Sequence, residues 1–496
     1  MKKYISLIAL LAIFTTSCTS DFLDTKSSVS VTDKDAFTTV ERAVTVLNGA
    51  YAYTGEYRYH TLATIATDVM GDDQTMTSGS YGFPTYNWNL YSYQYAQTPY
   101  DNPWWQGYSV YIWRYAYRAI DNCNSIIANE ATILPEGDDK KDIIAQARGL
   151  RGYHYLQLVQ LFAKAYNDDP SSPGIILKTV PDGIGSEGTA RTSVAAAYEV
   201  ITGDLKYAVE NITNTTGKDK LTSKGAALLL ARAYLTMNDM TNAKKYAEIA
   251  ADNTFDGSNL MSKEDWKTGF KDNNKEWLWY MNFISTNSNI YASMPSFYYY
   301  CREVKNYAYG ADVPLDSLKK YGVEKWEGYS TVRFTAAFRN MFEDNDCRKL
   351  FPFRVNSSDG YTTSKFGHRS QMGDAEFVMC RLAEAYLIKA EAEAITDPGT
   401  AENILNALQA ARGATPTSGD LLNNIYKERR KELYGEGFRL FDIKRLKQPL
   451  VRSVHPEHWT ALDLPANSPR FMFPLPSTEM TANKKLTQAD QNEFWR

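Results

Sequence analysis

The chain has 496 residues, of which 44% are hydrophobic and 23% are charged, and this composition is typical of a folded globular protein. Its formal net charge is −4, which argues against a nucleic-acid-binding protein because phosphate recognition needs a basic surface. Tyrosine is unusually frequent, with 35 Tyr against 21 Phe and 10 Trp. An excess of Tyr and Trp suits a wet surface that also buries ring faces, since each of these rings carries a polar group.

The first residues predict export and lipid attachment. Two lysines precede a short apolar run over 5–14, which is too short to cross a bilayer, and small residues then lead to Cys18. This order is typical of a cleaved secretory signal, and a cysteine at the cleavage position resembles a bacterial lipoprotein signal whose thiol carries the lipid. An ordinary signal peptide with an incidental cysteine is the alternative. We expect a signal peptide over 1–17 and a lipid anchor and polar tether over 18–35.

Residues 71–107 do not fit a helical pattern. The segment is rich in Gly, Asn, Ser and aromatic rings, and loops of this length in a compact protein are usually functional. The acidic residues around its start, Asp68, Asp72 and Asp73, could hold a structural calcium ion through hard oxygen ligands. They lack EF-hand spacing, so a solvated loop is the simpler interpretation, and we expect no other cofactor.

Helical periodicity dominates the rest of the chain. Apolar stripes alternate three and four residues apart over 112–126, 143–161 and 194–212, and each predicts one helix face turned towards a core. His154 lies on the second stripe, where a histidine is more often satisfied inside a core than bound to a ligand. These stripes favour a helical protein.

Two motifs suggest chemistry that the surrounding sequence does not support. Residues 183–188, GIGSEG, match a dinucleotide-binding pattern, but the next helix begins near Ser193 and no second parallel strand follows. Residues 455–458, HPEH, bring two histidines together without an evident third ligand, so we expect no zinc site.

Two stretches carry the spacing of tetratricopeptide units: a clear one over 230–250 and a broken one over 382–408. Single repeat units cannot bury their faces, so several must stack. We therefore expect an all-α fold in which about three or four helix pairs form a curved scaffold, with long aromatic-rich loops packed on it. We expect a single domain over 36–496, with halves of about 36–260 and 261–496.

No hydrolase pattern is recognisable. The chain has no G-x-S-x-G. The acidic pairs Glu384 with Glu391 and Glu428 with Glu432 lie on predicted helices beside Arg and Lys, so structural ion pairing is simpler than a glycosidase carboxylate pair. The run 427–433, KERRKEL, is a mixed-charge helix face rather than a basic patch. We expect a protein that is not an enzyme.

If Cys18 is lipidated, four cysteines remain: Cys123, Cys301, Cys347 and Cys380. Cys123 and Cys380 lie in helical patterns, which favours buried free thiols. Four cysteines also allow three disulfide pairings, and the sequence does not choose among them.

An ordered set of motifs along nearly the whole chain resembles the SusD/RagB family. The matching stretches, in family order, are the lipoprotein start with 21–24 (DFLD), 147–166 (ARGLRGYHYLQLVQLFAKAY), 191–205, 221–235 (LTSKGAALLLARAYL), 381–394 (RLAEAYLIKAEAEA), 425–445 (IYKERRKELYGEGFRLFDIKR) and 473–488 (FPLPSTEMTANKKLTQ). The stretch 425–445 is the most specific of them.

The resemblance implies a surface-exposed lipoprotein of a Bacteroidetes-type outer membrane. Such proteins bind glycans, or peptides in the RagB branch, and lie as a lid over a TonB-dependent transporter resembling SusC. The resemblance also implies that the helical motifs are scaffold rather than site. The aromatic-rich segments match the family in placement but not residue by residue, so the chemistry of the site stays open.

We expect ligand binding in 71–107 and in a second aromatic-rich segment, 285–330. A ring beneath a sugar buries apolar area at low entropic cost, while Asn, Asp and Arg bind the hydroxyl groups. The stacking candidates are Trp88, Tyr91, Trp104, Trp105 and either Tyr300 or Trp326, and the hydrogen-bonding candidates are Asp72, Asn87 and Asn102. Each ring could instead anchor its own loop. Trp277 and Trp279 alternate with other apolar residues like a short buried segment, so we leave them out.

Three functions compete on this basis: a glycan-binding lid of a transporter, a peptide-binding lid of the RagB kind, and a surface glycosidase. The first is the one we expect. A groove rich in backbone donors and poor in stacked rings would favour the second, and a close carboxylate pair in a cleft would favour the third.

Overall fold

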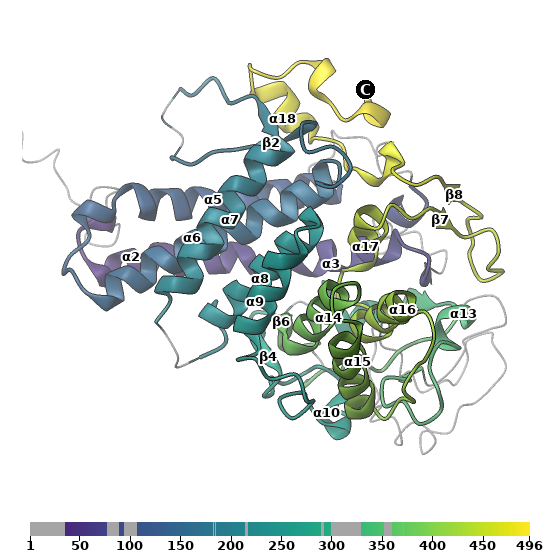
Figure 1. Cartoon of the computed structure of the whole chain (residues 1–496). Helices are drawn as coiled ribbons and strands as arrows, with labels where there is room; N and C mark the ends of the chain where they lie inside the picture. The colour runs from purple at the N-terminus through teal and green to yellow at the C-terminus, as the bar shows by residue number, and fades with distance from the viewer. Residues whose placement is uncertain are drawn as a thin grey trace, which may run out of the picture.

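The computed structural model describes residues 35–76, 89–93, 107–181, 183, 185–213, 217–288, 292–298, 329–351, 360–370 and 372–496. Helices make up most of this part of the chain (Figure 1). The predicted signal peptide, Cys18 and almost all of the tether lie outside it and stay predictions. No helix in the described ranges combines the length and apolar character needed to cross a membrane.

The scaffold is a stack of helix pairs, four of them within the described ranges. The pairs are α2 (Val40–Thr54) with α5 (Tyr108–Ala128), α6 (Asp138–Phe162) with α7 (Val194–Asn211), α8 (Ser223–Met237) with α9 (Met240–Ala250), and α14 (Leu382–Glu393) with α15 (Pro398–Arg412). Each pair packs on the next through α5 on α6, α7 on α8 and α9 on α14. The predicted all-α fold of three or four stacked pairs is therefore confirmed.

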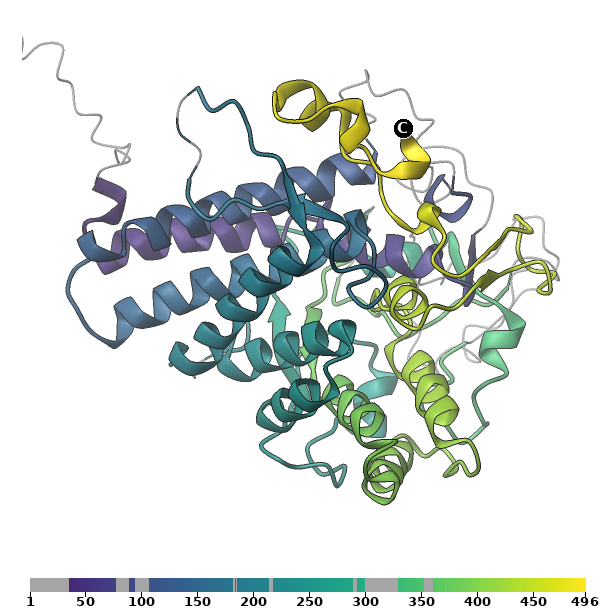
Figure 2. The same ribbon diagram turned by 45° about the horizontal axis from the view of Figure 1, so that its top comes forward.

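The remaining helices complete this stack. Helix α16 (Leu421–Leu433) packs on α14 and α15, and α17 (Arg439–Arg445) packs on α3 (His60–Val69). The short elements are α10 (Lys263–Lys267), α11 (Met294–Tyr298), α13 (Ala336–Arg339), α18 (Ser477–Ala482) and the 3-10 turns η3 (Asp35–Phe37), η4 (Glu130–Thr132), η6 (Pro469–Phe471), η7 (Gln488–Asp490) and η8 (Glu493–Trp495). Turning the molecule (Figure 2) keeps the start of α2 at one end and the C-terminal hairpin of residues 450–464 at the other.

The helices follow the apolar stripes of the sequence. Helix α7 buries its stripe, and the Ser193 hydroxyl caps its start by accepting the N–H of Ala196 at 3.1 Å. Helix α6 approaches α7 closely at Gly149, where a Cβ would meet Ala208 at 3.1 Å and Leu221 at 2.4 Å. The small residue therefore permits the spacing of this pair.

The strands form two-stranded antiparallel ladders, four within the described ranges. They are β1 (Gln74–Met76) with β5 (Val332–Phe334), β2 (Pro173–Ile176) with β3 (Arg191–Ser193), β4 (Trp277–Met281) with β6 (Phe377–Arg381), and β7 (Leu450–Val451) with β8 (Asp463–Leu464). The dinucleotide-like stretch 183–188 connects the antiparallel β2 and β3, which is not the parallel arrangement that such a site requires. Trp277 and Trp279 are fully buried on β4, as predicted.

The cysteine prediction is confirmed in part. Cys123 on α5 and Cys380 are buried free thiols, and Cys347 is also free. Cys380 lies on strand β6, so its assignment to a helix was wrong; α14 begins only at Leu382. The apolar residues 377–380 suit either element, and pairing with β4 decides the outcome. Cys301 lies outside the described ranges.

A buried ion-pair network holds the C-terminal helices together. Glu432 on α16 lies within 2.6 Å of Arg381 and 2.8 Å of both Arg348 and Arg412, and Arg412 also pairs with Glu276 at 2.8 Å. These side chains are almost completely buried. Burial would raise the pKa of the Glu432 carboxyl, but the guanidinium groups of Arg412, Arg381 and Arg348 hold that pKa well below its usual range.

The acidic pairs singled out in the sequence are parts of such ion pairs. Glu384 pairs with Arg232 at 2.7 Å, and Glu391 pairs with Arg445 at 2.5 Å. Glu428 pairs with Arg348 at 2.5 Å. Their structural role is confirmed, and it connects segments that lie far apart in the chain.

Candidate functional site

The two aromatic-rich segments leave the scaffold at one place, the β1–β5 ladder. Met76, the last residue of β1, lies opposite Val332, the first residue of β5. Residues 77–88 begin directly after β1, and residues 299–328 come shortly before β5. The antiparallel register therefore brings together chain positions that are about 250 residues apart in sequence.

The other end of the second segment is held at the same ladder. The Gln74 side-chain amide donates to the Tyr298 hydroxyl at 3.1 Å, and Tyr298 is the residue directly before 299–328. The Tyr298 ring is buried and stacks on Phe334 of β5, with centroids 5.9 Å apart. Gly360, at φ +72°, lies so close to this strand that a Cβ would come within 2.5 Å of the Phe334 carbonyl oxygen. The ladder is thus a tightly packed base for both segments.

Tyr91, a predicted stacking residue, lies beneath this base. Its ring is fully buried, with the Arg452 guanidinium 4.3 Å from the ring centroid. Its hydroxyl lies 2.9 Å from Nδ1 of His458. Burial lowers the pKa of His458 to about 3, so its imidazole is neutral. Nε2–H donates to the Asp72 carbonyl oxygen at 3.2 Å, which leaves Nδ1 to accept the Tyr91 hydroxyl. In this structure the buried Tyr91 ring anchors residues 89–93, which agrees with the alternative role considered for each ring.

Asp72, a predicted hydrogen-bonding residue, is held by arginines. Its two carboxylate oxygens accept from Nε and Nη2 of Arg439 at 2.6 and 3.0 Å. Burial would raise the pKa of Asp72, but the charges of Arg439 and Arg430 keep it well below its usual value. Asp73 pairs with Arg430. Two guanidinium groups against these carboxylates do not fit a calcium ion, and no cluster of metal-binding side chains occurs in the described ranges.

Asp68 also connects the residues before β1 to the start of α17. Its carboxylate accepts the backbone N–H groups of Gly437 and Arg439, each at 3.0 Å, which links α3 to the turn before α17. Burial raises the pKa of Asp68 to about 7. This contact fixes the residues from which the first aromatic segment starts.

The remaining candidates fall outside the described ranges. These are Trp88, Asn87, Asn102, Trp104, Trp105, Tyr300 and Trp326. Their contact with a ligand stays a prediction. The stretches 77–88 and 299–328, which contain Asn87, Trp88, Tyr300 and Trp326, have described ends at one ladder, whereas Asn102, Trp104 and Trp105 lie between Tyr93 and Gly107.

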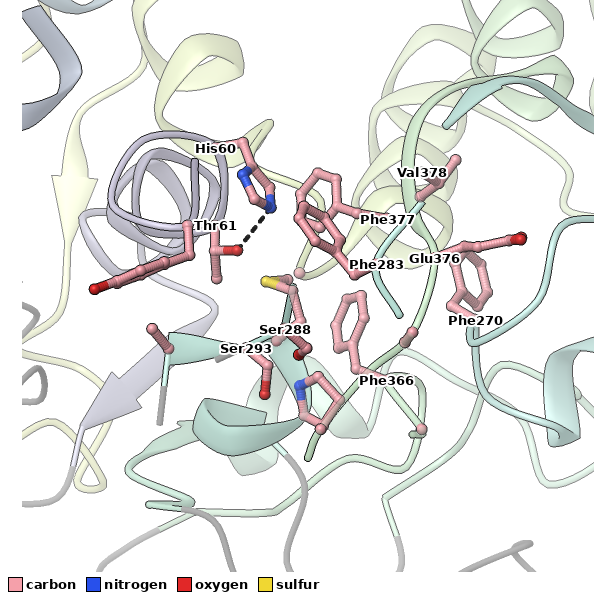
Figure 3. A pocket seen from close by; sticks show the side chains of 18 of the residues that line it. His60, Thr61, Phe270, Phe283, Ser288, Ser293, Phe366, Glu376, Phe377 and Val378 are labelled. Atoms are coloured by element: carbon pink, nitrogen blue, oxygen red, sulfur yellow. Dashed lines mark hydrogen bonds between the residues drawn. The ribbon is translucent and has the colours of Figure 1, made fainter. Parts of the chain in front are cut away.

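A cavity lined by aromatic rings lies where residues 283–288 and 292–295 meet strand β6 (Figure 3). His60 stacks on Phe283, with centroids 4.7 Å apart and planes 10° from parallel, and Phe377 meets the imidazole edge-on. Phe270 and Phe366 extend the apolar wall.

The imidazole in this wall is neutral. The Glu56 carbonyl oxygen accepts from Nδ1 of His60 at 3.0 Å, which leaves Nε2 to accept the Thr61 hydroxyl at 2.9 Å. Burial lowers the pKa of His60 to about 4. This wall of the cavity is therefore uncharged and suited to an apolar group of a ligand, while Glu376 and Glu436 line other parts of the cavity.

Comparison with known proteins identifies the family. Residues 232–495 match the model of the SusD family. The chain belongs to the SusD family. Residues 21–235 match a second model, described as starch-binding and associating with the outer membrane.

Individual relatives agree with this assignment over most of the chain. SusD-like protein P2 of Formosa agariphila is 27% identical over 76% of this chain and 79% of its own length. A SusD-like carbohydrate-binding protein of Bacteroides vulgatus is 28% identical, with a TM-score of 0.76 over 92% of this chain and 99% of its own. A laminarin-binding SusD-like protein shares the fold, with 18% identity and a TM-score of 0.68 over 91% of this chain and 99% of its own.

Sequence patterns missed two features of this SusD-family protein. The cavity of Figure 3 takes its rings from several stretches that lie far apart in the chain, so no local spacing marks it. The hairpin of residues 450–464 packs on Tyr91 and Asp72 through His458, whose HPEH motif we had considered only as a possible metal site. The sequence signal that could have drawn attention to this hairpin is Trp459, which directly follows the motif.

Proposed function

We propose that the protein captures glycans at the cell surface and delivers them to a TonB-dependent transporter resembling SusC. The observation that carries the proposal is that residues 77–88 and 299–328, parts of the two aromatic-rich segments, both have an end at the β1–β5 ladder. Two sets of Trp and Tyr rings starting from one rigid base can form one binding surface, on which rings cover sugar faces and Asn and Asp side chains bind hydroxyl groups. The carbohydrate-binding relative supports this choice.

The location of the protein is part of this proposal. We infer that Cys18 carries a lipid that holds the chain on the outer membrane, in agreement with the membrane association named for the family model over residues 21–235. The start of α2 and the hairpin of residues 450–464 lie at opposite ends of the molecule (Figures 1 and 2). An anchor before α2 would leave the end with the hairpin available to ligand and transporter.

We propose binding without turnover. The acidic pairs in the described helices are neutralised by arginines, which removes them as acid and base of a glycosidase. Incubating the intact protein with laminarin, starch, mannan and xylan should leave their oligosaccharide profiles unchanged. Cleavage of any of them would replace the proposal by a surface glycosidase.

The binding surface is tested with Trp88→Ala and Trp104→Ala. Each variant of the intact protein is titrated with the same four polysaccharides and melted thermally. A stacked ring contributes on the order of 1–3 kcal/mol, by analogy with base stacking, so affinity should fall about 5- to 150-fold with melting nearly unchanged. Unchanged affinity with lowered melting in both variants would mean that these rings anchor their loops.

A second function has one observation in its favour. One wall of the cavity in Figure 3 consists of Phe rings and a neutral imidazole, which suit an apolar side chain of a peptide better than a hydroxylated sugar, and Glu376 and Glu436 line the cavity beside it. A casein digest titrated against the protein tests this peptide-binding alternative. Peptide binding that is lost in Phe283→Ala, without polysaccharide binding by the unmodified protein, would favour it.

A further inference from the structure

Another pocket lies between α16 and α17, and neither function proposed above uses it. Five of the residues that line it are basic and one is acidic: Lys427, Arg429, Arg430, Arg439, Arg445 and Asp442. The chain as a whole carries a formal net charge of −4, so a lining this basic is a local feature. What the pocket can bind depends on how much of this charge is already compensated.

Two of the arginines are held by the residues directly before β1. Asp72 pairs with Arg439 at 2.6 Å, and Asp73 pairs with Arg430. Both carboxylates lie outside the lining, so they compensate the guanidinium groups from behind.

The other two arginines share Asp442. Its carboxylate accepts from Nε of Arg429 at 2.9 Å and from Nε of Arg445 at 2.7 Å. Glu391 also pairs with Arg445, at 2.5 Å. The five cations of the lining therefore meet four carboxylates, and one positive charge is left.

Lys427 carries the charge that is left. It is exposed on α16 and makes no ion pair within the described part of the chain. Glu384 comes within 3.9 Å of Arg429, but Arg232 compensates it at 2.7 Å. A single negative charge in the pocket would therefore complete the local balance.

The hydrogen-bonding groups that remain in the lining are mainly donors. The Tyr426 hydroxyl has no hydrogen-bond partner among the described residues, and burial raises its pKa to about 12, which keeps it protonated. The Gln448 side-chain oxygen accepts from Arg439 at 3.4 Å, which leaves the amide nitrogen to donate. Arg429, only 3% exposed, has an Nη1 without a hydrogen-bond partner in the described ranges.

This balance of donors selects the chemistry of the ligand. An ionised carboxylate only accepts hydrogen bonds, whereas a neutral sugar hydroxyl also donates and needs acceptors. The Asp442 carboxylate and the Gln448 oxygen already accept from arginines. The lining therefore suits an anion better than a neutral sugar.

We propose that the pocket between α16 and α17 binds one carboxylate group of a small organic acid, with Lys427, Tyr426 and Gln448 as its donors. The site goes beyond the glycan binding proposed above and does not depend on it. A sugar acid and an acylated amino acid both carry such a group, and separate titrations distinguish these two sources.

The test is calorimetric titration of the intact protein with galacturonate, N-acetylglycine and neutral galactose. Low salt is used because salt screens exposed charges. We expect at least one of the two carboxylates to bind and galactose not to bind. Tighter binding of galacturonate would identify a sugar acid as the source, and tighter binding of N-acetylglycine would identify an acylated amino acid.

Variants place the binding in this pocket. Lys427→Gln should weaken carboxylate binding about 2- to 5-fold, because it removes an exposed charge. Tyr426→Phe should weaken it about 2- to 10-fold through the loss of one hydrogen bond. The matched control is Lys141→Gln, which removes the same charge from an exposed lysine of α6 and should leave the affinity unchanged. Thermal melting should be nearly the same in all three variants.

Three results would overturn the inference. They are the absence of binding by both carboxylates, equal binding of galactose and galacturonate, and equal weakening in Lys427→Gln and Lys141→Gln. The last result would mean that the anion is attracted by the charge of the whole molecule. None of them bears on the proposed function, because that is measured with neutral polysaccharides such as laminarin and starch.

Discussion

His154 shows how a single buried side chain couples the fold to pH. Thr54 donates its hydroxyl to the Ala50 carbonyl oxygen, so it must accept from Nε2 of His154 at 3.0 Å. Nδ1 then accepts the Tyr59 hydroxyl at 2.7 Å. The ring is a neutral, fully hydrogen-bonded core residue, as its place on an apolar stripe predicted, and burial lowers its pKa to about 3.

We therefore predict acid sensitivity that depends on His154. Its folded pKa lies below the unfolded value of about 6.5, so the unfolded chain binds the extra proton and stability falls as pH drops below about 6.5. Between pH 7.5 and 5.0 the loss from this residue is about 2 kcal/mol. Urea unfolding at both pH values should show a drop smaller by that amount in His154→Asn, although this variant is less stable at pH 7.5. An equal drop in both proteins would contradict the assignment.

Glu432 supports a second prediction at this scale. Glu432→Gln leaves Arg348, Arg381 and Arg412 with less compensating charge in a dry interior, which should lower the free energy of unfolding by about 3–5 kcal/mol. The control is Glu264→Gln, because the exposed Glu264–Lys267 pair contributes less than about 1 kcal/mol. Both variants are measured by chemical denaturation. Comparable losses would show that the buried network contributes no more to stability than an exposed ion pair.

Among the elements, the β1–β5 ladder is the base of the proposed binding surface. Gly360→Ala would place a Cβ against the Phe334 carbonyl oxygen and force β5 to move. We predict a loss of about 1–3 kcal/mol in stability and weaker polysaccharide binding, because the end of 299–328 moves with the strand. Gly419→Ala is the control: it shares a positive φ, of +92°, but has no atom within 4 Å, so only backbone strain of about 1 kcal/mol and unchanged affinity are expected. Thermal melting and titration distinguish the two variants. Equal effects of Gly360→Ala and Gly419→Ala would show that the close contact between Gly360 and Phe334 does not hold β5 in place.

The elements also show why sequence reasoning succeeded for helices and not for the site. The stripes of α5, α6 and α7 and the small residues of α9 repeat every three or four residues, so one segment carries the whole signal. Strands β1 and β5 have three residues each and find one another only through tertiary packing. Glu428 and Glu432 were recognised as ion pairs beside local Arg and Lys, yet Arg348 and Arg381 come from distant segments. The sequence therefore predicted that these glutamates pair with basic side chains, but it did not predict which arginines they pair with.

For the whole molecule, Cys18 should decide location. Cys18→Ala removes the proposed lipid site, and each buried methylene of an acyl chain contributes about 0.8 kcal/mol to membrane binding. We predict that the variant moves from the membrane fraction to the soluble fraction, as measured by fractionation and immunoblotting. Cys347→Ala, at a free thiol of the folded body, is the control and should stay with the membrane. Membrane retention of Cys18→Ala would show that another element anchors the chain.

The β1–β5 ladder also bears on how such proteins diversify. Met76 and Val332 are paired on a base whose packing involves Phe334, Tyr298 and Gly360, all outside the stretches 77–88 and 299–328. Lengthening a flexible loop costs little, about 0.6 kcal/mol for each doubling. We therefore predict that these stretches, which we propose to bind the ligand, can be exchanged between relatives while the helices keep their sequence. A chimaera that receives both stretches from another family member should fold on this scaffold and take the donor's ligand preference.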